Sequence, residues 1–114
     1  MNRQTDAREE ILNNLREIVR KAIGDFPADV YLFGSWAHRE EKRSSDIDVG
    51  ILPRGEIPRG VWAMLRERIE ESPIPYRVDL VDLSKAEDSF REKVMKEGIS
   101  WLTLEKESSL RNKP

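Results

Sequence analysis

The sequence predicts a small mixed α/β (α+β) domain, built from one β-sheet with helices mainly on one of its faces. Segments with the periodicity of an amphipathic helix alternate along the chain with short segments rich in β-branched and aromatic residues. Glycine and proline stand between these segments, where turns are expected. The chain has 114 residues with 38% apolar content, so we expect a single domain over residues 1–104 and a charged tail over residues 105–114.

The first half of the chain contains one clear helix and two strands. Apolar residues recur every three or four positions over Asp6–Ile23, which predicts an amphipathic helix that ends at Gly24. Residues 30–33 are β-branched or aromatic and too few for a helix, so they predict a strand, with a second helix beginning at Ser35. Residues 46–52 predict the next strand, closed by a loop rich in proline and glycine.

The second half repeats the alternation. Residues 61–69 have apolar side chains at helical spacing, and residues 76–83 predict a third strand. Ser84 and Glu87 have the spacing of a capping box, which predicts a helix that continues to Gly98. The segment Ile99–Leu104 predicts a short edge strand.

Charge and composition exclude several classes of function. The net charge is −2, from 20 basic and 22 acidic residues, so we expect no direct binding of duplex nucleic acid. No cysteine is present, which excludes thiol redox chemistry and thiolate metal sites. No apolar run approaches the roughly 20 residues that span a bilayer, and the first residues lack a signal peptide's apolar stretch, so we expect a cytoplasmic protein with no membrane contact. Assembly into a homo-oligomer stays open.

Three carboxylates are expected on one face of the sheet. Side chains alternate between the two faces of a strand, so Asp46 and Asp48 project together. The same alternation in the third strand places Asp79 on their side when Val78 and Leu80 face the helices. Like charges this close repel one another, and a hard divalent cation such as magnesium stabilises such a group.

The Gly34-Ser35 pair predicts an anion site beside these carboxylates. A glycine at the end of a strand lets the backbone approach a ligand, and the free N–H groups of a following helix attract a phosphate. Arg39 and Lys42 either meet that phosphate or belong to a solvated charged surface. A phosphate site next to a cation-binding carboxylate group is what transfer of a nucleotidyl group from a triphosphate requires.

These residues resemble a known signature. Gly34-Ser35, ten intervening residues and Asp46-Ile47-Asp48 are similar to the GSx10DxD motif of the DNA polymerase beta-like nucleotidyltransferase superfamily, and 77–80 resembles the strand of its third carboxylate. The resemblance implies a nucleotidyltransferase fold in which Asp46 and Asp48 hold two magnesium ions. It further implies that Asp79 completes the site near the acceptor hydroxyl, and that Gly34 and Ser35 bind ATP.

The length and element order resemble the minimal nucleotidyltransferases of the MNT or MntA type, which act as antitoxins beside a HEPN-domain toxin. The resemblance implies transfer of AMP from ATP to a hydroxyl of that protein partner. In many relatives the motif serine is followed, after one intervening residue, by Ala-Arg-Gly. This chain has Ala37-His38-Arg39 at that place. This departure keeps an alternative open: a subunit with weak or no turnover that neutralises a HEPN partner by contact. Trp36 either stacks on adenine, contacts a partner or packs in the core.

Overall fold

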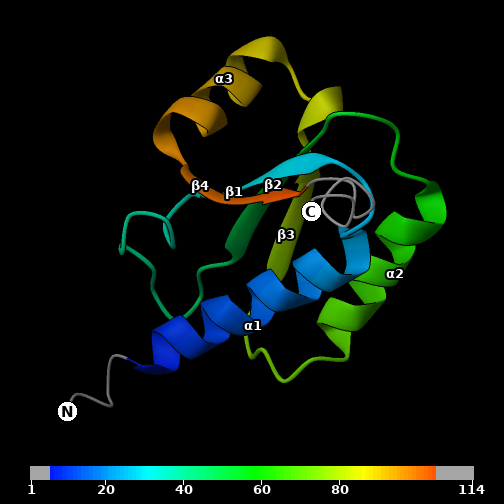
Figure 1. Ribbon diagram of the computed structural model, residues 1–114. Helices are drawn as coiled ribbons and strands as arrows, with labels where there is room; N and C mark the ends of the chain where they lie inside the picture. Colours follow the sequence, from blue (N-terminus) through cyan, green and yellow to red (C-terminus); the bar gives the residue numbers. More distant parts are fainter. Residues whose placement is uncertain (1–5, 105–114) are drawn as a thin grey trace, which may run out of the picture.

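The computed structural model describes residues 6–104, which fold around one four-stranded sheet (Figure 1). Its strands have the order β3-β2-β1-β4. Strand β1 pairs antiparallel with both β2 and β4, while β2 and β3 are parallel. The mixed sheet confirms the predicted fold class, and the last strand lies at an edge as expected. In chain order the elements are α1 (Asp6–Ile23), β1 (Ala28–Phe33), β2 (Ile47–Pro53), α2 (Arg59–Glu70), β3 (Val78–Asp82), the 3₁₀ turn η1 (Leu83–Lys85), α3 (Asp88–Glu97) and β4 (Ile99–Leu104).

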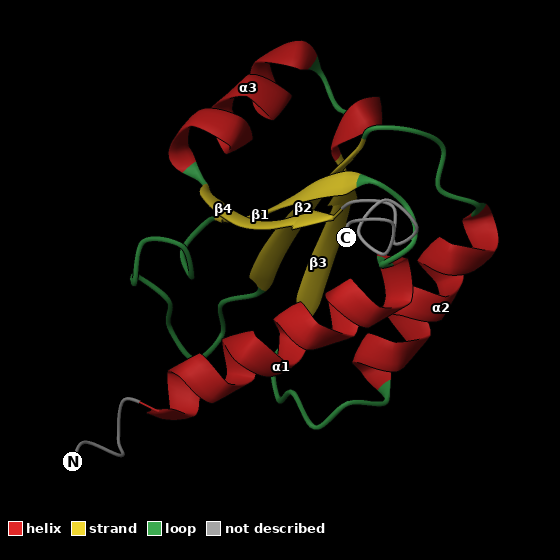
Figure 2. Ribbon diagram, viewed as in Figure 1, coloured by secondary structure: helices red, strands yellow, loops and turns green. Residues whose placement is uncertain are grey.

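Helices α1 and α2 cover one face of the sheet, and the shorter α3 lies on the other side (Figure 2). The core between the two long helices and the sheet is apolar, because alternate strand residues turn toward it. It includes Leu15 of α1, Leu65 of α2, Val30 of β1 and Val49 of β2, all fully buried. On the opposite face Phe33 of β1 meets Phe90 of α3 edge to face. On the same face, the fully buried Leu83 of η1 lies against Gly50 of β2.

Two predicted starts of helices are wrong. The helix expected at Ser35 is absent, because residues 35–39 form consecutive turns. The strand that follows, β2, begins at Ile47, one residue later than expected. Helix α3 begins at Asp88, because Asp82 already accepts a hydrogen bond from the Ser84 backbone and another from its hydroxyl. Glu87 precedes the helix and makes no side-chain capping bond.

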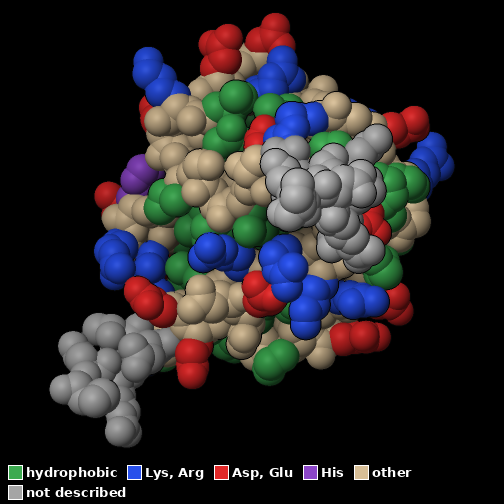
Figure 3. Space-filling model, in the orientation of Figure 1, with side chains coloured by type: hydrophobic (Ala, Val, Ile, Leu, Met, Phe, Trp, Pro, Cys, Tyr) green, Lys and Arg blue, Asp and Glu red, His purple; other side chains and the backbone are tan. Residues whose placement is uncertain are grey.

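Surface charge is mixed on the face shown in Figure 3, where lysine and arginine side chains lie among aspartates and glutamates. Within residues 6–104, no helix is long and apolar enough to cross a membrane. The predicted tail over residues 105–114 lies outside the described residues.

Candidate active site

The turn after β1 is packed directly against a carboxylate of β2. Gly34 has a backbone φ of 76°, a conformation that favours glycine. A Cβ atom at this position would lie closer than 3.0 Å to Oδ2 of Asp48. Glycine is therefore required here twice, by the turn and by the neighbouring carboxylate.

Two backbone donors of this turn have no partner within the described part of the chain. The N–H groups of Ala37, His38 and Glu40 donate to carbonyl oxygens of Gly34 or Ser35, which closes the turn. The N–H groups of Ser35 and Trp36 donate to no acceptor among residues 6–104, and the Ser35 hydroxyl makes no hydrogen bond there. Free backbone N–H groups in a tight turn attract an anion. The sequence expected the anion site at the start of a helix, whereas the structure has these free donors in a turn.

Two of the three predicted carboxylates lie side by side in the sheet. Asp48 of β2 and Asp79 of β3 are direct partners in the parallel register, so their side chains project from the same face. Burial raises the pKa of the Asp48 carboxyl, and the charges of Asp79 and Asp46 raise it further. Asp46 lies just before β2 and is exposed. The three carboxylates therefore form one electrostatically coupled group.

This group suits a divalent cation by its chemistry. Carboxylate oxygens are the ligands that magnesium prefers, and a cation would remove the repulsion felt by Asp48. Within residues 6–104, however, there is no group of three or more aspartate, glutamate, histidine or cysteine side chains arranged to hold a metal ion. The carboxylates are near enough to interact electrostatically, and their oxygens would have to turn toward a shared ion.

A cavity of about 350 Å³ opens beside the turn that follows β1, residues 34–40, which we call the phosphate turn after its expected role. One wall is the turn itself, with Gly34, Ser35 and His38. The other wall is α3, which contributes Phe90 and Lys93. The sequence interpretation missed both of these α3 residues, because α3 shows only the pattern of an amphipathic helix and no motif connects it to the turn.

The remaining predicted nucleotide-binding residues lie farther along the loop. Arg39 and Lys42 are exposed, and neither lines the cavity beside the turn. Arg39 has a φ of 58°, which only a few per cent of residues other than glycine adopt. The resemblance to the nucleotidyltransferase motif implies a glycine here in many relatives. The loop thus has a glycine-type backbone conformation at a residue that is not glycine.

Trp36 belongs to the core. Its side chain is 2% exposed, and its ring meets that of Tyr76 edge to face at a centroid distance of 4.9 Å. A ring enclosed in this way is not available for stacking on adenine. Of the alternatives open from the sequence, the structure supports core packing.

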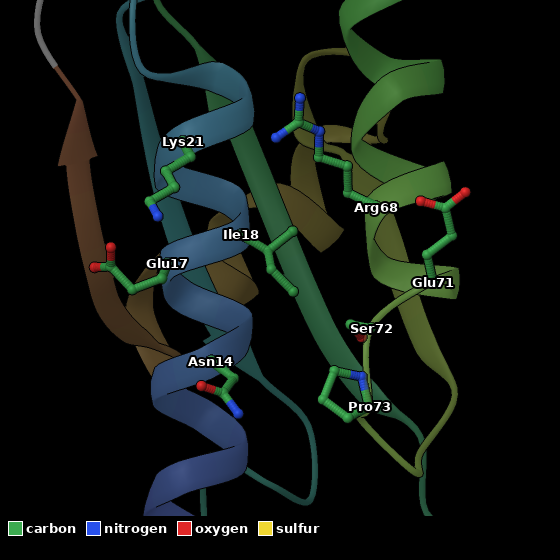
Figure 4. A pocket seen from close by; sticks show the side chains of 8 residues that line it. All are labelled: Asn14, Glu17, Ile18, Lys21, Arg68, Glu71, Ser72 and Pro73. Atoms are coloured by element: carbon green, nitrogen blue, oxygen red, sulfur yellow. The ribbon is translucent and has the colours of Figure 1, made fainter.

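A larger hollow of about 660 Å³ lies elsewhere, between α1 and α2 (Figure 4). Ile18 projects between the two helices there, with Arg68 and Pro73 on the side of α2. None of the predicted site residues lines it. Although this hollow is larger than the cavity beside the turn, it is not the candidate active site.

Known proteins resemble this chain in sequence and in fold. Residues 13–107 match the family described as "Polymerase beta, Nucleotidyltransferase". The "Probable protein adenylyltransferase MntA" of Haemophilus influenzae is 31% identical over 93 residues, which cover 82% of this chain and 80% of that protein.

Two solved structures share the fold. A toxin–antitoxin crystal structure with AMP-PNP has a TM-score of 0.66 and 27% identity, and the match covers 80% of this chain and 72% of that chain. A minimal nucleotidyltransferase has a TM-score of 0.65 and 30% identity, with 79% and 92% covered. The chain therefore belongs to the polymerase beta-like nucleotidyltransferases, among their minimal, MntA-type members.

Proposed function

We propose that this protein transfers AMP from ATP to a hydroxyl group of a protein partner, as the antitoxin of a HEPN/MNT toxin–antitoxin pair. The observation that carries the proposal is the contact between Gly34 and Asp48. This contact supports a phosphate-binding turn next to the three carboxylates, and nucleotidyl transfer needs both at once. A turn or a carboxylate pair alone would fit many other functions.

The residues of the site fall into two sets, one that binds the triphosphate and one that would bind the metal ions. The N–H groups of Ser35 and Trp36 and the Ser35 hydroxyl bind the triphosphate, and Lys93 of α3 approaches it across the cavity. Asp46, Asp48 and Asp79 would hold two magnesium ions, which when bound neutralise the triphosphate and favour ionisation of the acceptor hydroxyl. Arg39 and Lys42 act from the exposed loop on the outer phosphate oxygens.

Asp79 lies at the acceptor side of the site. It is exposed on the edge strand β3 and lines a groove of about 570 Å³ that also contains Arg66 and Tyr76. A hydroxyl delivered there forms a bond to the α-phosphorus, the bond to the β-phosphate oxygen breaks, and pyrophosphate leaves while the hydroxyl proton passes to water. Because the groove is open, the partner must bring and orient the acceptor.

The nature of the partner is supported by the relatives. One solved relative is a toxin–antitoxin structure with AMP-PNP, and the curated relative has the name of a protein adenylyltransferase. The resemblance to the MNT family points to a HEPN-domain toxin, with AMP added to a tyrosine near its ribonuclease site. The added negative charge and bulk would block the binding of RNA.

A second function is supported by a separate observation. Arg39 keeps a left-handed backbone conformation in the loop next to the turn, and this strained residue stands where relatives have glycine. A loop altered in this way suits a subunit that neutralises a HEPN partner by contact and transfers AMP slowly or not at all.

Intact mass spectrometry separates the two functions. A HEPN partner incubated with the protein, ATP and magnesium should gain whole AMP units, and Asp79→Asn should abolish the gain while the complex still forms. Asp82→Asn is the matched control, since it alters the same strand at a position that pairs with Ile51 instead of Asp48. Neutralisation of the partner without any gain in mass, unchanged in Asp79→Asn, would establish the contact-only function.

A further inference from the structure

Arg8 of α1 reaches across to the loop that follows the phosphate turn. Its Nε donates to Oε2 of Glu41 at 2.7 Å, and a second guanidinium nitrogen lies 3.5 Å from Oε1 of the same carboxylate. That nitrogen also donates to the backbone carbonyl of Trp36. The side chains of Arg8 and Glu41 are each 20% exposed, so water screens this ion pair less than one on the open surface.

The same guanidinium lies over the ring of Trp36, with its central carbon 5.5 Å from the ring centroid. Trp36 is held from another side by Tyr76. Arg8 thus fastens the phosphate loop, residues 34–41, at two points: the carbonyl and ring of Trp36, and the carboxylate of Glu41. The turn that contains the free N–H groups of Ser35 and Trp36 begins immediately before the first of these points.

A lysine could not replace this arrangement. The guanidinium is a rigid planar group that donates in several directions at once and stacks on an aromatic ring, whereas an ammonium is a single strongly hydrated charge. The Arg8 hydrogen bond also lowers the pKa of Glu41, so this carboxylate stays ionised as a partner further into the acidic range.

We propose that Arg8 is a positioning residue for the nucleotide site: it holds residues 34–41 in the one shape in which the Ser35 and Trp36 N–H groups receive a phosphate. This inference rests on the proposed function for its consequence and on the contacts of Arg8 for its structural part. It makes the first turns of α1 part of the nucleotide site, although Arg8 touches no expected phosphate position.

The test measures loop order and nucleotide affinity in the full-length protein. Hydrogen exchange of a peptide covering residues 34–41 should become faster in Arg8→Gln and Arg8→Lys, because the turn loses its anchor. Calorimetry with ATP and magnesium should show affinity lower by about tenfold in both variants, from the loss of charge-assisted bonds that hold the site in its binding shape. Glu41→Gln should have a smaller effect, since the carbonyl bond and ring contact of Arg8 remain. Arg16→Gln, which removes an exposed cation from the same helix, is the control and should change neither quantity.

The outcomes distinguish positioning from general stability. Arg8→Lys should keep a melting temperature within a few degrees of the unchanged protein, so that its loss of affinity cannot come from unfolding. Unchanged exchange over residues 34–41 in Arg8→Gln would overturn the inference, and so would unchanged ATP affinity in a variant whose loop exchanges faster. If the protein without any substitution binds no ATP, the proposed function is overturned instead. Hydrogen exchange would still decide whether Arg8 orders the loop.

Discussion

The backbone of Gly34 rests against the carboxylate of Asp48, so the phosphate turn of β1 and the carboxylate group of β2 form one packed unit. Neither half can shift without disturbing the other. The unit stands at the end of two antiparallel strands in which Phe33 is the direct partner of Asp48. The sheet therefore fixes the start of this unit, and the contacts of Arg8 with Trp36 and Glu41 hold the residues that follow.

Gly34→Ala should damage both the fold and nucleotide binding. An alanine at a φ of 76° costs roughly 1 to 2 kcal/mol from its backbone conformation alone, and its methyl group would strike the Asp48 carboxylate. We expect a loss of at least about 2 kcal/mol in chemical denaturation, together with loss of ATP binding in calorimetry.

Gly55→Ala is the control for this change, because a Cβ at Gly55 would meet no atom within 4 Å. It should alter stability by less than about 0.5 kcal/mol. In an Asp48→Ala background the cost of Gly34→Ala should fall to the backbone part alone. If the two substitutions proved additive, the contact between residues 34 and 48 would not be what makes glycine necessary.

Asp48→Asn should stabilise the protein in the absence of metal. A pKa raised above the ordinary value of 3.8 means that the folded state binds the proton of Asp48 more tightly than the unfolded state does. Ionisation therefore costs stability as the pH rises above this value, and the cost is absent at lower pH, where both states are protonated. Because water reaches this carboxylate, we expect the free energy of unfolding to rise by at most about 1 kcal/mol at pH 7. This gain should vanish near pH 3. Urea denaturation in the presence of a chelator measures it at both pH values.

An aspartate-to-asparagine substitution in the neighbouring strand β1 should destabilise the protein instead. Asp29 of β1 forms an ion pair with Arg54 at 2.7 Å, so Asp29→Asn should destabilise at pH 7 by about 0.2 to 1 kcal/mol. Equal effects of the two substitutions would show that Asp48 feels no net repulsion.

The sequence predicted the parts of the site that depend on local pattern. Strand alternation predicts that Asp48 and Asp79 share one face of the sheet, because it rests on the geometry of extended chains. That they are direct partners depends on strand order and register, which alternation does not fix. The helix expected at Ser35 was wrong because residues 38–46 have no apolar stripe to bury, and the chain instead returns through turns to pair β2 with β1.

Contacts between distant segments could not be predicted. Arg8 and Trp36 are joined only by tertiary packing, and nothing in the residues around Arg8 marks it as different from the other charged residues of α1. Lys93 likewise lines the cavity beside the turn only because α3 folds back over β1, where Phe90 meets Phe33. A single sequence contains no local signal for either contact.

Arg39→Gly should raise stability and lower nucleotide affinity. Glycine adopts a φ of 58° without steric cost, so the folded protein should gain up to about 1 kcal/mol. Loss of the cation should weaken ATP binding severalfold, since Arg39 is assigned to the triphosphate. Thermal melts and calorimetry measure the two effects separately.

His38→Gly provides the comparison, because His38 is not among the residues with positive φ. There glycine only adds freedom to the unfolded chain and should cost about 0.5 to 1 kcal/mol. An Arg39→Gly protein with unchanged ATP affinity would remove Arg39 from the nucleotide site, while the backbone argument would stand on the stability result.

Charge changes on α3 should shift ATP affinity in opposite directions. Lys93 and Glu97 lie one helical turn apart and both line the cavity beside the phosphate turn, whereas Lys96 does not line it. Lys93→Gln should weaken ATP binding and Glu97→Gln should strengthen it, each by up to about fivefold, as expected for partly exposed charges near a phosphate. Lys96→Gln keeps the same change of net charge as Lys93→Gln and should leave affinity unchanged. The effects of Lys93→Gln and Glu97→Gln should both shrink as salt rises from about 50 to about 300 mM, because ions screen charges that water can reach. Equal responses of Lys93→Gln and Lys96→Gln would mean that ATP senses only the net charge of the protein, and that its phosphates bind outside this cavity.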